Sequence, residues 1–236
     1  MIISCNTIKY QEYLRIYRFE SFLQREILRK LQLCSFRDGE YLCREGEPCD
    51  YLYFLVDGRC KVTRFLNNGK EALICFYHDF AVLGEIELIQ SFRMIGQQTP
   101  EQKSVTRTNV KAIGPVWCMR LPLAATQGVI MESPPFLRFL CEHLSQKMIR
   151  SNRNMSISLN YPVDERLASY ICCSCQKGIF QENHTHLAEY LGCSHRQLLR
   201  VLHQFCEEGL LKKERHFYRI EDEERLRKLA GDIYSP

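Results

Sequence analysis

Short apolar and aromatic runs alternate with turn residues along the first half of the chain, from Phe36 to about Leu121. The runs Tyr51–Val56, Lys61–Phe65 and Ala72–Tyr77 are rich in residues that favour strands. Glycine-containing pairs lie between the runs and supply the positive backbone angles of tight turns. These pairs are Asp38-Gly39, Glu45-Gly46, Asp57-Gly58 and Asn68-Gly69. Short strands at this spacing predict a β-sandwich or a barrel.

The hydrophobic period changes after Pro134-Pro135. Apolar and small residues then recur at alternating steps of four and three, which is a heptad pattern. A helix from about Pro135 to Asn160 would be about 39 Å long, more than one small domain needs for its own core. The pattern favours pairing with a second copy, and the alternative is a single helix lying on the sandwich. The recurring positions are Leu137, Cys141, Leu144, Met148, Ser151, Met155 and Ser158.

Pro162 breaks this long helix, because proline lacks the amide hydrogen and disfavours helix in the residue before it. We expect a hinge there. An amphipathic pattern resumes from Asp164 to Cys175, with its apolar face formed by Leu167, Ala168, Ile171 and Cys172.

The segment from Asn183 to Ile220 predicts a helix, a tight turn, a second helix and a hairpin. Asn183 can cap the first helix, and Leu187, Ala188 and Leu191 form its inner face. Gly192 ends that helix, and Ser194 can cap the next one two positions later. So short a connection makes the helices cross steeply, as in a helix-turn-helix.

The second helix has a polar start and an apolar side. The first turn of a recognition helix enters the major groove, so Arg196 can pair with guanine, Gln197 with adenine and Ser194 with a phosphate. The wing from Lys212 to Ile220 brings further cations to the DNA backbone. A helical hairpin for protein contact is the alternative. The predicted DNA-binding residues are Ser194, His195, Arg196, Gln197, Arg200, Lys212, Lys213 and Arg215, and the predicted buried ones are Leu198, Leu199, Val201, Leu202 and Phe205.

The charge of the segment from Gly192 to Arg219 supports DNA binding, whereas the net charge of the whole chain does not decide it. The net charge is +4, too small to indicate a nucleic-acid partner by itself. From Gly192 to Arg219, however, six Lys and Arg residues stand against three Glu residues. No apolar run is long enough to cross a bilayer, and Met1–Tyr10 lacks the pattern of a signal peptide, so we expect a cytoplasmic protein with no membrane partner.

Thirteen cysteines are scattered through apolar segments, where cytosolic cysteines usually act as small buried hydrophobes. Redox sensing and metal binding are the alternatives. Cys172-Cys173-x-Cys175 with His184 or His186 suggests zinc, but these cysteines lie on a helix whose apolar face needs filling.

The whole layout resembles the Crp/Fnr family of bacterial regulators. The resemblance spans about Phe36 to Ile220 and includes the Asn68-Gly69-Lys70-Glu71 and Leu83-Gly84-Glu85 signatures. The stretches LGEIELI, VWCMRLPL and AEYLGCSHRQLLRVLHQF resemble the YeiL-type branch of that family. The resemblance implies an α+β chain with a cyclic-nucleotide-binding-like jelly roll, a dimerisation helix and a winged helix-turn-helix.

The resemblance also implies a ligand pocket, from which this sequence departs. Family members that bind cyclic AMP hold the ribose with the glutamate matching Glu85 and the phosphate with an arginine. Thr106 stands at the arginine's place, and the strand's period of two turns Arg107 to the opposite face. Residues Ser91–Lys103 look inserted, and Gly84-Glu85 serves as a structural turn in the alternative interpretation. The candidate pocket residues are Gly84, Glu85, Arg107 and Ser151.

Neither familiar cofactor is expected. Cyclic AMP is disfavoured by the missing arginine, and the iron-sulfur cluster of some relatives is disfavoured because its region offers only Cys5 and Cys34, where four thiolates are usual. The effector therefore stays unknown. The recognition helix has His195, Arg196 and Gln197 where the family has arginine, glutamate and a small residue, which predicts an unusual operator.

We therefore predict a sensor domain over residues 1–133, a dimerisation helix over 134–161 and a DNA-binding domain over 162–236. The expected partners are double-stranded operator DNA, a second copy of the chain and, for an activator, RNA polymerase. No catalytic residues are predicted. The alternative is an enzyme or small-molecule-binding protein whose C-terminal domain docks a protein partner.

Overall fold

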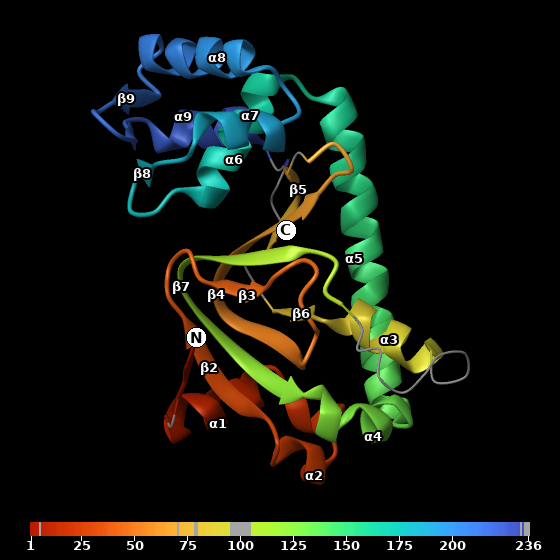
Figure 1. Cartoon of the computed structure of the whole chain (residues 1–236). Helices are drawn as coiled ribbons and strands as arrows, with labels where there is room; N and C mark the ends of the chain where they lie inside the picture. The colour runs from red at the N-terminus through yellow and green to blue at the C-terminus, as the bar shows by residue number, and fades with distance from the viewer. Residues whose placement is uncertain (5, 70, 78–79, 95–104, 232, 234–236) are drawn as a thin grey trace. The chain divides into compact units, whose positions relative to one another are not determined.

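The computed structural model describes residues 1–4, 6–69, 71–77, 80–94, 105–231 and 233 (Figure 1). The chain divides into two compact units. The first contains Met1–Lys61 and Tyr77–Ile149, and the second contains Val62–Phe76 and Arg150–Pro236. The chain is of the α+β class, with the sandwich, long helix and helix-turn-helix that the sequence predicts.

Seven strands of the described chain belong to one sheet with the path β1-β2-β7-β4-β5, to which β3 adds on β7 and β6 on β4. Antiparallel β2 and β7 pair from Gln32 opposite Arg120 to Phe36 opposite Val116. This is the predicted strand-rich half of the chain. The strands are β1 (Ile2–Ile3), β2 (Gln32–Phe36), β3 (Tyr41–Cys43), β4 (Tyr51–Phe65), β5 (Glu71–Tyr77), β6 (Ala81–Leu83) and β7 (Asn109–Pro122).

The Asp57-Gly58 pair does not make a turn, and that prediction is wrong. β4 continues through both residues, so the two predicted runs form one strand. Gly58 has a φ of 99°, and a Cβ there would lie 2.6 Å from the carbonyl oxygen of Pro115. Glycine is needed because a neighbouring backbone passes close by, not because the chain reverses. The other predicted turns contain Gly39, Gly46 and Gly69, all with positive φ.

Helices pack against the sheet and complete the core of the first unit. Phe22 stacks on Phe139 of the long helix with ring centroids 3.9 Å apart, and Phe19 meets Phe54 of β4 edge-on. These rings belong to one buried cluster with leucines from β2, β4 and β7. The elements are α1 (Thr7–Ile16), η1 (Phe19–Ser21), α2 (Arg25–Leu28), α3 (Glu85–Met94), η2 (Leu123–Ala125) and α4 (Gln127–Met131). Of the predicted insertion, Ser91 to Met94 end α3, and residues 95–103 lie outside the described residues.

The long helix α5 spans Pro134–Asn160. Two prolines open it, where first-turn amide hydrogens have no partner inside the helix in any case. Phe136 and Leu140 are buried in the first unit's core, and Leu144 of the predicted heptad packs against the same core. Leu144 is thus a heptad residue that packs against the first unit's core and is not free to pair with a second helix.

Of the other described heptad positions of α5, Leu137 is half-buried and the rest are exposed. Cys141 and Ser151 are exposed, and Met148 is 62% exposed. Ile149, which the heptad pattern does not include, is 68% exposed. The side chains of Met155 and Ser158 lie outside the described residues. The helix therefore presents an apolar strip besides its inward face.

The second unit contains the predicted helix-turn-helix. Its described elements are α6 (Val163–Ser174), β8 (Ile179–Phe180), α7 (His184–Tyr190), α8 (His195–Glu207), β9 (Leu211–Lys213), β10 (Tyr218–Ile220) and α9 (Glu223–Ala230). The wing was predicted with two strands, but β10 pairs with β9 on one side and β8 on the other, so the sheet has three.

Helix α6 is buried on nearly every side, because α9 packs against it as well as the helix-turn-helix. Leu167, Ala168 and Ile171 are buried as predicted. Cys172 is only partly buried, and the neighbouring Cys173 takes the inward position instead. Tyr170, which the sequence pattern did not single out, is fully buried.

Candidate nucleic-acid interface

Helix α7 begins with the side-chain cap that the sequence predicts. The Asn183 Oδ1 accepts hydrogen bonds from the amide groups of Thr185 (2.9 Å) and His186 (3.1 Å). These are two of the amide groups that a helix start leaves without internal partners. Leu187, Ala188 and Leu191 are buried, which anchors α7 in the unit.

A tight turn joins α7 to α8. Gly192 has a φ of 60°, a left-handed conformation in which other residues are strained. The Cys193 amide donates to the Ala188 carbonyl at 3.0 Å, closing the end of α7. The guanidinium of Arg166, on α6, donates to the Leu191 carbonyl. Arg166 is only 9% exposed, so a buried cation fixes the turn between the two helices.

Helix α8 starts with a capping box. The Ser194 Oγ accepts from the Gln197 amide at 3.2 Å, and the Gln197 Oε1 accepts from the Ser194 amide at 3.1 Å. The two side chains thereby satisfy two backbone groups reciprocally. In this conformation Gln197 uses its oxygen on the helix start, so the pairing with adenine that the sequence suggests needs a different rotamer.

The exposed side of α8 carries the predicted DNA-reading residues. Ser194, His195, Arg196, Gln197 and Arg200 are all exposed. The opposite side buries Leu198, Val201, Leu202 and Phe205 as predicted. The expectation that Leu199 is also buried is wrong, because its side chain is 40% exposed.

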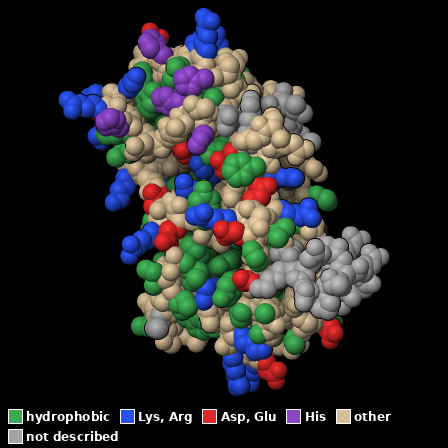
Figure 2. All heavy atoms as spheres, in the orientation of Figure 1, with side chains coloured by type: hydrophobic (Ala, Val, Ile, Leu, Met, Phe, Trp, Pro, Cys, Tyr) green, Lys and Arg blue, Asp and Glu red, His purple; other side chains and the backbone are tan. Residues whose placement is uncertain are grey.

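The wing places more cations near α8. β9 and β10 pair from Leu211 opposite Ile220 to Lys213 opposite Tyr218. Leu210 and Leu211 are buried beneath the wing, whereas Lys212, Lys213 and Arg215 are exposed. Figure 2 shows Lys, Arg and His side chains over the surface of this part of the chain. Such a surface suits the phosphates of a duplex.

Two candidate ligand residues of the first unit, Gly84 and Glu85, already contact other parts of the chain. Glu85 is 3% exposed, and its Oε1 lies 2.6 Å from the Nζ of Lys147 on α5. Gly84 has a φ of 93°, and a Cβ there would lie 2.9 Å from the Tyr51 carbonyl oxygen. Close backbone packing therefore explains Gly84 without any ligand, which favours the structural-turn interpretation.

Arg107 and Ser151 are the other two candidates. Thr106 is buried and Arg107 exposed, which is the alternation expected of extended chain. The Arg107 Nε donates to Gln90 at 2.9 Å, and its backbone amide donates to Glu87 at 2.9 Å. Ser151 is exposed on α5 and belongs to the second compact unit.

Five of the twelve cysteines of the described chain are buried, six are half-buried and one, Cys141, is exposed, so the expectation of buried cysteines holds only in part. Burial raises the pKa of Cys34 and Cys49 to about 12 and that of Cys172 to about 11, so these thiols stay protonated at neutral pH. Among the described residues no three His, Cys, Asp or Glu side chains are grouped as a metal site requires. The structure therefore does not assemble the suggested zinc site from Cys172, Cys173, Cys175 and a histidine. Cys5, one of the two cysteines considered for a cluster, lies outside the described residues.

Two charged side chains that hold parts of the candidate sites in place were not found from sequence. Lys147 pairs with Glu85 across 62 positions, and Arg166 holds the α7 end across 25. Pairs so distant leave no local pattern. The only feature of the sequence that could have pointed to Arg166 is its position, as a cation, beside the apolar residues of α6.

Comparisons with known proteins agree with this geometry. Residues 33–133 match the cyclic nucleotide-binding domain family, and residues 165–229 match the Crp-like helix-turn-helix domain family. The chain is 34% identical over 202 residues to the regulatory protein YeiL of Escherichia coli O157:H7, covering 86% of this chain and 87% of that protein. It is 25% identical over 214 residues to a CRP-like cAMP-activated global transcriptional regulator of Mycobacterium tuberculosis, covering 86% and 90%.

A solved structure supports the same fold. A transcriptional regulator of the Crp/Fnr family from Eubacterium rectale superimposes with a TM-score of 0.71 at 18% identity, covering 93% of this chain and 99% of that one. The capped helix-turn-helix, the wing and these matches define a DNA-binding transcription regulator. The chain belongs to the Crp/Fnr family. Separately, no helix among the described residues has the length and apolar composition needed to span a membrane.

Proposed function

We propose that this chain works as a cytoplasmic homodimer that binds a two-fold-symmetric operator and changes the pose of its winged helices when the sensor domain registers a signal. The exposed first turn of α8 beside the cationic wing carries the proposal. Dimerisation through α5 is supported by its exposed apolar strip at Cys141, Met148 and Ile149. In this scheme residues 1–133 sense, 134–161 dimerise and 162–236 bind DNA.

Each DNA-binding residue has a proposed role. Arg196 reads a base edge in the major groove, with His195, Gln197 and Arg200 beside it. Ser194, Lys212, Lys213 and Arg215 contact phosphates and set the register on the duplex. RNA polymerase is a further partner if the regulator activates transcription.

The signal in this proposal is not cyclic AMP. The relative from Mycobacterium tuberculosis is cAMP-activated by name. In the present chain the carboxylate of Glu85 is paired with Lys147 instead, and Arg107 is exposed and bonded to Gln90. A different small ligand or a redox signal fits these departures better.

The test is salt-dependent binding of the full-length protein to a pool of random duplexes, followed by sequencing of the retained ones. We expect an enriched motif with two-fold symmetry and half-sites about one helical turn apart. Affinity should fall steeply between 50 and 200 mM salt, roughly 10³-fold or more if six or more phosphates are contacted. An absence of retained DNA at low salt, with and without cell extract as a source of ligand, would contradict the proposal.

A further inference from the structure

Histidines are concentrated in the helix-turn-helix and wing. Five of the chain's seven lie between residues 184 and 216, and Figure 2 shows histidine side chains gathered on that part of the surface. Histidine is the side chain whose ordinary pKa, about 6.5, lies closest to physiological pH. The five are His184, His186, His195, His203 and His216.

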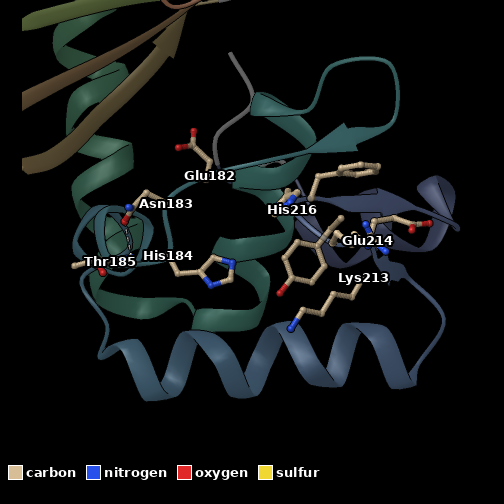
Figure 3. Close-up of a pocket in the computed structure, with 10 residues that line it drawn as sticks. Glu182, Asn183, His184, Thr185, Lys213, Glu214 and His216 are labelled. Atoms are coloured by element: carbon tan, nitrogen blue, oxygen red, sulfur yellow. Dashed lines mark hydrogen bonds between the residues drawn. The ribbon is translucent and has the colours of Figure 1, made fainter.

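Two of these histidines, His184 and His216, line a pocket. An open pocket of about 350 Å³ lies between the start of α7 and the wing. Figure 3 shows the His184 imidazole directed into it, with the Lys213 side chain along its lower edge. The carboxylates of Glu182 and Glu214 point away from the pocket in the same view. Glu182 accepts a hydrogen bond from the buried Tyr170 hydroxyl at 2.8 Å, which holds it in that direction.

The charged groups around His184 are two cations, Lys213 and Arg215, and two carboxylates, Glu182 and Glu214, that point away from the pocket. Its ring centroid lies 6.3 Å from that of His195 at the start of α8 and 6.0 Å from that of Tyr218 on β10. Burial, then His195 and Lys213, lower the pKa of His184, and no carboxylate is among the causes. The charged or titratable groups facing it are Glu182 before α7, His195 on α8, Lys213 on β9, Glu214, Arg215 and His216 in the wing turn, and Tyr218 on β10.

Such a pocket favours an anion. Donor groups from the start of α7, from β9 and from the wing turn line it, and both nearby carboxylates are directed elsewhere. His195 is also the first residue of α8, the proposed recognition helix, and Lys213 belongs to the proposed phosphate-binding wing. A duplex held by both elements brings its backbone against the space between them. The anion that fits this position is therefore a phosphate of the bound DNA.

We propose that this pocket binds a backbone phosphate of the operator and that His184 takes up a proton when it does so. The inference rests on the proposed function. A phosphate beside the imidazole favours its charged form, so the DNA-bound protein holds more proton than the free protein. By linkage, operator affinity then rises as pH falls through the interval between the two His184 pKa values. If the phosphate raises that pKa by about half to one unit, binding strengthens about three- to tenfold for each protomer, which is about ten- to hundredfold for a dimer with both pockets filled.

The first experiment measures the dissociation constant of the full-length protein for one duplex from pH 8.0 to 5.5 at constant ionic strength. The wild-type dimer should bind about ten- to hundredfold more tightly at the acid end. His184→Gln should lose more than half of this rise. His203→Gln is the matched control, because His203 is exposed on α8 and paired with Glu207 at 3.3 Å, and it should keep the wild-type rise.

The outcomes separate the two proposals. Binding by wild type at pH 8, where histidine is neutral, supports DNA binding whether or not affinity depends on pH. A wild-type affinity that stays flat, or a full acid rise in His184→Gln, overturns the proton uptake. Loss of all binding at every pH instead counts against the proposed function.

A second experiment keeps the native sequence. The carbon-bound ring protons of His184 are titrated by NMR in the free protein, with the duplex and with 10 mM inorganic phosphate. We expect the duplex to raise the His184 pKa by about half to one unit and phosphate alone to leave it unchanged. An equal rise of the His184 pKa with inorganic phosphate would show that the pocket binds a small free anion. No rise with the duplex would show that no DNA phosphate lies beside His184. Either result overturns the proposal.

Discussion

The capping box at the start of α8 allows a test of how much the Ser194 side chain stabilises the proposed recognition helix. Ser194→Ala removes the Oγ that accepts from the Gln197 amide but leaves the Gln197 side chain on the Ser194 amide. Loss of such a cap costs about 1 kcal/mol. The free energy of unfolding should fall by that amount, which corresponds to a drop in melting temperature of about 2–4 °C for a chain of this size.

Hydrogen exchange gives the local readout. The Gln197 amide should exchange about fivefold faster in Ser194→Ala, because 1 kcal/mol changes an equilibrium by about that factor. Amides in α6, such as that of Arg166, bonded to the Pro162 carbonyl at 3.2 Å, should keep their rates and serve as the internal control. Unchanged stability and unchanged exchange in Ser194→Ala would show that the cap contributes nothing.

Ser194→Asp separates capping from DNA contact. Aspartate caps helices as well as serine does, and a negative charge at a helix start is stabilising, so stability should be kept or slightly raised. The same charge repels a phosphate, so DNA affinity should fall by tenfold or more, that is, by roughly 1.4 kcal/mol or more. If Ser194→Asp bound DNA as tightly as wild type, the proposed phosphate contact at Ser194 would be wrong.

Four further substitutions test other parts of the molecule. Arg196→Ala should relax the base preference at one operator position at a cost of about 1–3 kcal/mol, whereas Lys212→Ala should weaken all sequences alike, as measured by binding selection. Gly58→Ala should cost about 3 kcal/mol or more in urea unfolding, because the added Cβ meets the Pro115 carbonyl oxygen at 2.6 Å and the φ is positive; a cost under about 1 kcal/mol would show that the strands can separate. Lys147→Met leaves the buried Glu85 carboxylate without its cation and should cost about 3 kcal/mol in urea unfolding at pH 7; an unchanged free energy of unfolding would show that the pair contributes nothing.

Local chemistry made the helix-turn-helix predictable from sequence. Asn183, Gly192 and Ser194 each act through backbone groups within a few positions. Their residue types at this spacing therefore predict a cap or a turn. The structure bears out each of them with a hydrogen bond or a positive φ. The long helix was predictable for the same reason, since proline marks both of its ends.

Contacts between distant segments were not predictable. Asp57-Gly58 has the composition of a turn, but its glycine is required by Pro115, 57 positions after Gly58, and no local pattern reveals that approach. The strand β8 is only two residues long and is fixed by pairing with β10, so its own sequence carries little signal. Leu199 illustrates the remaining error, because an apolar residue type alone does not decide which side of a helix is buried.

The ion pair between Lys147 and Glu85 has a consequence for any effector of this regulator. The cation that occupies Glu85 is part of the same chain, so it competes with a diffusing ligand at an effective concentration in the millimolar range or above. A molecule that engaged Glu85 would have to displace this tethered competitor and release the hold of α5 on the β6–α3 corner. Engagement of Glu85 and release of α5 would then be one and the same event, and weak or scarce ligands would leave α5 held in place.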